Sequence, residues 1–263
     1  MPTPMPVLFL GHGSPMNAIE DNAFSRGWAA IAREIPRPKA ILMVSAHWET
    51  EGVLLTASDA PETIHDFYGF PKALFDVRYS APGARWLAER ARDLIAASAV
   101  RPTRIGLDEG RGLDHGAWSV LLPMYPDASV PVVQLSLDRS LTPAQHLELG
   151  KALAPLRDEG VLVIGSGDIV HNLRVDFRRA EAQPWALSFN ERAKSLILEG
   201  DDAALAGYES LGPEALASIN SAEHFLPLLY VLALRRPDDA VRFFNDAVFA
   251  AISMTSIVLD RAA

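Results

Sequence analysis

The sequence predicts an α/β fold: one domain spanning residues 1–263, with a central β-sheet flanked by helices and a functional site at the carboxyl ends of the strands. Continuous apolar runs of strand length alternate with segments whose apolar residues recur at helical spacing, which is typical of βαβ units. Two of these runs end at small residues followed by a histidine. Open α/β sheets bind their ligands at the carboxyl ends of strands, so the same pattern predicts the place of the site.

The first strand is expected at residues 7–10, an apolar run that ends at a histidine held between two glycines. Gly11 and Gly13 lead the chain out of the strand and leave space around the imidazole of His12. We interpret His12 as a metal ligand whose partners come from the rest of the chain.

The second strand repeats this arrangement. Helical spacing predicts a helix over residues 23–35, and the apolar run at residues 40–44 predicts the next strand, which leads through Ser45 and Ala46 to His47. A βαβ unit brings the ends of its two strands to one edge of the sheet, so the two imidazoles are expected to converge. The alternative for each is a surface loop histidine.

The rest of the chain continues as alternating strands and helices. Strands are expected at residues 53–56, at 130–137, from 161 into a glycine turn at 165–167, and as a closing pair at 241–244 and 251–259. Helices are expected at residues 84–97, 117–124, 143–157, 186–199, 203–208 and 213–219, with a last helix capped by Ser221. His146, inside one of these helices, is interpreted as a surface or structural residue.

Residues 63–71 are rich in aromatic side chains and are broken by Gly69 and Pro71, which favours a long ordered loop. Two interpretations stay open for this loop. Its rings either stack against an aromatic substrate or pack over the sheet as an anchor.

Composition limits the classes of function. With 49% hydrophobic and 22% charged residues the chain has the make-up of an ordinary globular domain. A net charge of −9 argues against binding to nucleic acid or to an anionic membrane surface. Since cysteine is absent, a metal site has to use His, Asp, Glu or water, which favours ions such as Fe(II), Zn, Mn or Co. No basic, apolar leader opens the sequence and no apolar run is long enough to span a bilayer, so we expect a cytoplasmic protein.

Three further histidines stand beside turn or helix-start residues. His115 precedes an expected helix, where a helix N-terminus favours a neutral imidazole; a structural cap by Asp114 is the alternative. His171 follows the glycine turn at 165–167, and His224 lies next to Glu223 at the start of the last helix. A site assembled from separate strand and helix ends is expected.

The motifs GHGSPMN, SAHW, TIHDF, LDHGAW, SGDIVHNLR and EHFLPLLY occur in this order along nearly the whole chain. Together they resemble the class III extradiol ring-cleavage dioxygenases, in the branch related to DOPA 4,5-dioxygenase. The resemblance implies an α/β fold with a central mixed sheet and one non-haem Fe(II), which Zn(II) can replace. It also implies a small aromatic diol and dioxygen as the molecules that bind.

The resemblance assigns roles to individual residues. His12 and His47 match the first two metal ligands, and His224 is expected to be the third, with Glu223 as the alternative. His171 matches the acid/base residue and is a possible fourth ligand for zinc. His115 matches the histidine that contacts substrate or oxygen.

Ring contacts are expected from the aromatic segments near these motifs, at His65, Trp48, Phe67 and Tyr68. Asp168 and Asn172 are expected to orient His171. The resulting prediction is a dioxygenase that cleaves a catechol (DOPA-like) ring. The alternatives are a zinc-dependent hydrolase or lyase on the same fold, in which a zinc-bound water is the nucleophile, and a non-catalytic member that only binds.

Overall fold

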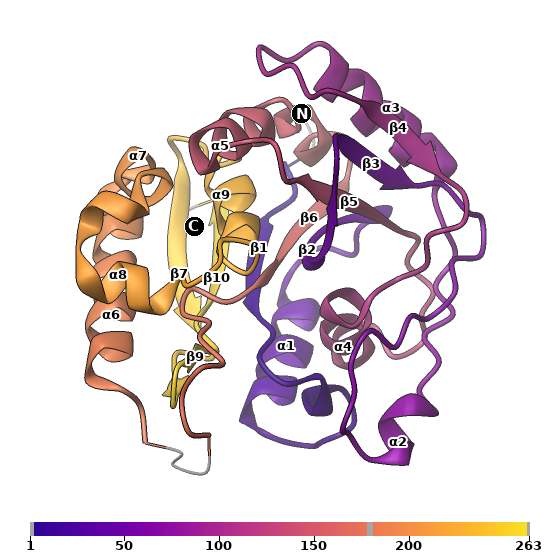
Figure 1. Cartoon of the computed structure of the whole chain (residues 1–263). Coiled ribbons are helices and arrows are strands. Elements are labelled where there is room, and N and C mark those ends of the chain that lie inside the picture. The colour runs from indigo at the N-terminus through magenta and orange to yellow at the C-terminus, as the bar shows by residue number, and fades with distance from the viewer. Residues whose placement is uncertain (1–2, 178–180, 262–263) are drawn as a thin grey trace.

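A large mixed β-sheet runs through the middle of the protein, with helices on both faces (Figure 1). The computed structural model describes residues 3–177 and 181–261, and within these residues the sheet has eight strands in the order β4-β3-β5-β2-β6-β1-β10-β7. They are β1 (Val7–Gly11), β2 (Ala40–Thr50), β3 (Val53–Thr56), β4 (Ile105–Asp108), β5 (Val132–Asp138), β6 (Val161–Gly167), β7 (Asp239–Phe244) and β10 (Ser256–Arg261). A separate two-stranded ribbon pairs β8 (Val248–Phe249) with β9 (Ile252–Ser253).

The centre of the sheet is parallel and its flanks are not. Strands β1, β6, β2 and β5 pair in parallel, whereas β10 runs antiparallel to β1 and β3 antiparallel to β5. The predicted α/β class with a central mixed sheet is therefore confirmed. Because β6 lies between β1 and β2, the carboxyl ends of these three strands meet at one edge of the sheet.

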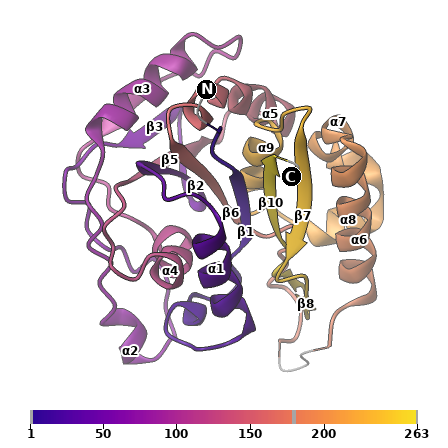
Figure 2. The ribbon, with the colours of Figure 1, turned by 180° about the vertical axis from the view of Figure 1, so that it is seen from behind.

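Each face of the sheet carries its own apolar core, as the alternation of side chains along a strand requires. In β1, Val7 and Phe9 pack into one core, and Leu8 and Leu10 pack into the other. The Leu8 face is covered by α1 (Ala23–Glu34) and α4 (His115–Met124), as the two opposite views show (Figures 1 and 2). The opposite core includes residues of α3 (Arg85–Ala96), α5 (Pro143–Lys151), α6 (Pro184–Glu199), α7 (Asp202–Ala206), α8 (Pro213–Ser218) and α9 (Leu226–Leu232).

Local sequence explains where several helices begin and end. Asn22 caps α1 by accepting hydrogen bonds from the backbone of Phe24 and Ser25, and the Ser25 side chain completes a capping box. Thr142 and Gln145 form the same motif at α5. Helix α6 ends at Glu199 and is capped by Gly200, whose φ of 76° is the left-handed conformation that glycine adopts readily.

The most informative departure from prediction is in β2, which was expected to end at Val44 but runs on to Thr50. Val44 pairs with Leu135 and Glu49 pairs with Leu137, so an advance of five residues along β2 corresponds to an advance of only two residues along β5. His47 therefore lies in an irregular part of the strand rather than after its end. Such irregular segments redirect side chains, and this one occurs beside the histidine cluster described below.

Other boundaries differ for identifiable reasons. The helix predicted over 143–157 ends at Lys151 and is followed by a 3₁₀ helix, Ala154–Arg157, because Pro155 cannot continue the α5 hydrogen bonds. Ser221 is not a helix cap, since α9 begins at Leu226 with Pro227 in its first turn. The strand predicted over 251–259 is divided between β9 and β10. The short strand β4 and α2 (Lys72–Phe75) were not predicted.

His146 is fully buried in the structure, so the surface interpretation was wrong and the structural one holds. Its Nε2 donates to the Asp138 carbonyl at 3.1 Å, and its Nδ1 accepts from the Tyr230 hydroxyl at 3.0 Å. None of the described helices combines the length and apolar character needed to cross a membrane.

Candidate metal centre

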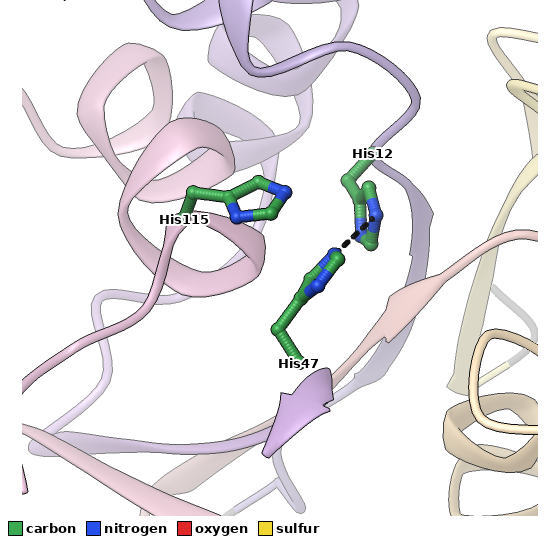
Figure 3. Close-up of side chains that lie close together, drawn as sticks. All are labelled: His12, His47 and His115. Carbon is green, nitrogen blue, oxygen red and sulfur yellow. Dashed lines mark hydrogen bonds between the residues drawn. The ribbon is translucent and has the colours of Figure 1, made fainter. Parts of the chain in front are cut away.

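Five histidine side chains from separate parts of the chain meet at the carboxyl edge of the central strands. The ring of His12 lies 5.1 Å from that of His47 and 5.3 Å from that of His224, measured between centroids. His115 stands 3.8 Å from His47, and His171 stacks on His224 at 3.5 Å with 7° between the planes. Figure 3 shows three of them, His12, His47 and His115, pointing toward one another.

Different elements deliver these side chains. His12 directly follows β1, His47 lies in the irregular part of β2, and His115 is the first residue of α4. His171 comes after β6, and its backbone N–H donates to Ser218 at 2.9 Å. His224 lies in the turn before α9.

Two glycines permit the close packing of this edge. A Cβ on Gly167 would lie 2.1 Å from the backbone oxygen of His224, so only glycine lets that turn rest against the end of β6. Gly13 has a φ of +54°, a left-handed conformation that a larger residue adopts with strain. The chain can therefore turn sharply directly after His12.

The tautomer of His12 follows from its neighbour Ser166. The hydroxyl of Ser166 donates to the Gly116 carbonyl, which can only accept. The Ser166 oxygen, 3.0 Å from Nδ1 of His12, must then accept the ring proton of that nitrogen. In neutral His12 the Nε2 atom therefore carries a lone pair and no proton.

Carboxylates hold two other rings in the same way. Nδ1 of His115 donates to Asp66 at 2.9 Å, and the backbone N–H of His115 donates to the same oxygen at 3.0 Å. Nδ1 of His224 donates to Glu223 at 3.0 Å. Both rings thus keep Nε2 for another partner, an arrangement typical of metal-ligating histidines. Here Glu223 serves as the partner of His224, although its carboxylate also lies within reach of His171 and His224.

Burial keeps most of these imidazoles neutral. It lowers the pKa of His12 and of His224 well below the usual value, and repulsion from the neighbouring imidazoles adds to the effect. Burial also lowers the pKa of His47 to about 3 and that of His171 to about 4. At neutral pH these four rings offer lone pairs rather than charges.

The nitrogen positions suit a metal ion. The Nε2 atoms of His12 and His47 lie 3.2 Å apart, drawn as a dashed line in Figure 3. Two nitrogens that are each about 2.1 Å from one ion, at an angle of about 90–110°, are about 3.0–3.4 Å apart. The potential ligand atoms of His12, His47 and His115 all lie within 4.8 Å of one another, and so do those of His12, Asp168 and His224. The residues present therefore fit a divalent ion.

Two residues expected to orient His171 contact other groups instead. Asp168 lies beside His12 instead, with Oδ2 at 3.6 Å from Nε2 of that ring and Oδ1 accepting from the Gly13 backbone. Burial raises the pKa of Asp168 well above its usual value. Asn172 donates to the Ala217 carbonyl at 2.7 Å.

A cavity of about 500 Å³ opens over the cluster. All five histidines line it, and most of the other lining side chains are apolar or aromatic. These side chains, which we call the apolar wall, are Pro15, Phe67, Tyr68, Phe70, Leu173, Phe177 and Ile252. A small planar aromatic molecule fits a space of this size and lining.

Of the expected ring contacts, Phe67 and Tyr68 line the cavity, and Tyr68 is 92% exposed at its mouth. Trp48 is not among the described lining residues: it is 5% exposed, and the Arg111 guanidinium lies 5.3 Å from its ring. His65 lines a neighbouring hollow of about 620 Å³ and donates through Nε2 to the Val77 carbonyl. Both positions lie outside the cavity, contrary to the expectation that they contact the substrate.

Sequence reasoning missed Asp66 and Ser166. Asp66 belongs to the TIHDF motif, where an acidic residue in a loop rich in aromatic side chains could have indicated a role in the site. Ser166 was interpreted as part of a turn, and only the pairing of β6 with β1, which sets Ser166 opposite Leu10, brings it near His12.

Comparison with known proteins agrees with this geometry. The family model described as the catalytic LigB subunit of aromatic ring-opening dioxygenase matches residues 5–250. A protein of Escherichia coli (strain K12) named 4,5-DOPA dioxygenase extradiol is 49% identical over 236 residues, which cover 88% of this chain and 85% of that protein. The protein of the same name from Beta vulgaris is 42% identical over 224 residues, covering 84% and 83%.

The fold comparison points the same way. The crystal structure of an uncharacterised protein from Escherichia coli K12 matches with a TM-score of 0.80 and 38% identity, covering 97% of this chain and 99% of that one. The family match extends over most of the sequence, and the alignments with the two named relatives cover most of the length of each relative. The chain therefore belongs to the family of catalytic LigB subunits of aromatic ring-opening dioxygenases.

Proposed function

We propose that this protein is an extradiol dioxygenase that opens the ring of a catechol, such as DOPA, with dioxygen. The observation that carries the proposal is the pair of Nε2 atoms of His12 and His47 at 3.2 Å, with the ring proton of His12 held on Nδ1 by Ser166. The names of the relatives, 4,5-DOPA dioxygenase extradiol, support the reaction and the substrate class.

His12, His47 and His224 are the proposed metal ligands, with Glu223 as the partner that orients His224. Imidazole ligands suit Fe(II) and also Zn(II). Bound Fe(II) would supply open coordination positions for the diol and for dioxygen, together with a route for electrons between them.

His171 is the proposed acid/base residue. Its ring reaches the cavity and stacks on His224, beside the proposed metal ligands. Since burial lowers its pKa to about 4, the ring is neutral at neutral pH and can accept a phenolic proton from the bound diol. The imidazolium formed in this way can return that proton later in the reaction.

His115 is proposed to contact the substrate or dioxygen from the opposite side. Asp66 accepts the Nδ1 proton of His115, which leaves Nε2 as the polar atom available to a ligand. The carboxylate thereby fixes the orientation of the ring before a substrate arrives.

The apolar wall of the cavity is proposed to hold the aromatic ring. Phe67 and Phe70 lie edge to face with centroids 5.3 Å apart, and Phe67 also meets the His115 ring at 5.6 Å. A planar diol between this wall and the histidines would have its oxygens toward the metal side. The apolar surface also limits the access of water to the reacting ring.

The ligand set itself favours one second candidate, a zinc-dependent hydrolase or lyase. Neutral histidines around an open position are the arrangement in which zinc activates water. The test is to load metal-free protein with Fe(II) without air or with Zn(II), and then to add catechol or DOPA in the presence of oxygen. We expect a yellow ring-opened product and oxygen uptake from the Fe(II) form alone. Absence of product from that form, with ester or amide hydrolysis by the Zn(II) form, would contradict the proposal.

A further inference from the structure

Asp168 is a carboxylate buried behind the histidine cluster, one residue after the end of β6. Its side chain has no exposed surface, and its Oδ1 accepts a hydrogen bond from the Gly13 backbone at 3.1 Å. Among the described residues, none donates a hydrogen bond to its Oδ2. Burial disfavours the ionised carboxylate and raises its pKa, so Oδ2 is stabilised either by its own proton or by a positively charged partner.

The neighbour of Oδ2 is Nε2 of His12, at 3.6 Å. His12 cannot donate from this nitrogen when neutral, because its ring proton lies on Nδ1 and goes to Ser166. When Asp168 is ionised, two atoms that both carry lone pairs therefore face each other. A cation removes this repulsion, either a proton on Oδ2 in the metal-free protein or a metal ion bound to both atoms.

His224 brings a third donor to the same point. The potential ligand atoms of His12, Asp168 and His224 all lie within 4.8 Å of one another. Two ligands of one ion, each about 2.1 Å from it, are separated by about 3.0–4.2 Å, depending on the angle between them. The distance of 3.6 Å between Asp168 and His12 falls in this range.

We propose that Oδ2 of Asp168 is a direct ligand of the metal ion, next to His12 and His224. The inference rests on the proposed metal centre and adds to it an anionic oxygen that the histidines do not supply. Neutral imidazoles bring no negative charge into direct contact with a divalent ion, and the carboxylates of Glu223 and Asp66 act only through the rings to which they are hydrogen-bonded. With His12, His47 and His224, the ion would have three imidazole ligands and one carboxylate oxygen, donor types that suit Fe(II) and Zn(II).

Asp138 provides an internal comparison. It is also fully buried, and its Oδ2 also lacks a hydrogen-bond partner among the described residues. Its Oδ1 accepts from Ser140, and it belongs to none of the potential ligand groups found among the described residues. Both aspartates therefore have an Oδ2 atom without a hydrogen-bond donor. What distinguishes Asp168 is that its carboxylate lies close to ring nitrogens of His12 and His224.

The test compares Asp168→Asn with the matched control Asp138→Asn. Asparagine keeps the shape and an oxygen that can accept from Gly13, but it removes the charge. Affinity for Zn(II) or Co(II) is measured by chelator competition on metal-free protein. We expect affinity in Asp168→Asn to fall by more than the roughly 10–100-fold that loss of an outer-shell partner causes, and to stay unchanged in Asp138→Asn. Equal affinity in Asp168→Asn and the unaltered protein would overturn the inference, whereas an unaltered protein without affinity for metal would contradict the proposed function.

A second measurement avoids substitution, since Asp168→Asn can also impair folding. In a crystal structure of the unaltered protein loaded with Zn(II), we expect Oδ2 of Asp168 within about 2.3 Å of the ion. A separation above about 3 Å with the ion held by histidines would overturn direct ligation, whatever the affinity of the variant.

Discussion

The Nε2 atoms of His12 and His47 lie 3.2 Å apart, although the two residues are 35 positions apart in the sequence. Each nitrogen belongs to a ring whose pKa is lowered by burial, so the pair shares one proton at most. A metal ion between them takes the place of that proton and satisfies both lone pairs. Metal binding at this pair therefore competes with a proton on Nε2 of His47.

Ser166→Ala tests the control of the His12 tautomer. The substitution removes the oxygen that accepts the Nδ1 proton, so the ring is free to place its proton on Nε2. We expect metal affinity to fall by roughly 10–100-fold, measured by chelator competition. Ser136→Ala is the matched control, because Ser136 is equally buried but hydrogen-bonds to Leu54 and Thr50. A similar fall in both variants would show a general loss of stability instead.

His224→Ala and His115→Ala distinguish a metal ligand from a substrate contact. Both rings are nearly buried and both donate through Nδ1 to a carboxylate, so the two substitutions disturb similar surroundings. We expect His224→Ala to lose stoichiometric metal, measured by elemental analysis after anaerobic loading. His115→Ala should keep the metal and lose catalytic rate. The reverse result would exchange their roles.

His171→Ala tests the acid/base assignment. A positioned proton acceptor contributes about 10²–10⁴-fold to a rate, so we expect kcat to fall by that factor while the bound metal stays unchanged. Rate and metal content are measured on the same Fe(II)-loaded samples. Loss of metal in proportion to the loss of rate would identify His171 as a ligand.

His146 is expected to contribute to the pH dependence of the free energy of unfolding, because burial lowers its pKa to about 4 in the folded protein. In the unfolded chain the histidine pKa is near 6.5, so the unfolded state binds a proton at His146 before the folded state does as pH falls. The free energy of unfolding therefore decreases below about pH 6.5. Between pH 7.5 and pH 5 the loss from this residue is about 2 kcal/mol. Urea unfolding of metal-free protein should show a smaller pH effect, by that amount, in His146→Gln. Parallel curves for the two proteins would contradict this account.

Much of the fold and the location of the histidine cluster follow from local sequence, because apolar strands that end in glycine and histidine are a short-range pattern. The short strand β4 escaped prediction since its four residues are all only partly buried and show no continuous apolar run. Trp48 was expected beside the substrate because it adjoins His47 in the sequence, but adjacency does not set the direction of a side chain in an irregular part of a strand. The register that sets Ser166 opposite Leu10, and the loop contact between Asp66 and His115, are long-range pairings that one sequence does not encode locally.

The most direct test of the account follows isotopically labelled dioxygen through the reaction. Fe(II)-loaded protein is mixed with catechol or DOPA, and the product is analysed by mass spectrometry beside the His171→Ala variant. The account predicts a ring-opened semialdehyde acid with label from dioxygen in its new carboxylate, formed far more slowly by the variant. An unaltered ring, or a product with oxygen from water alone, would contradict it.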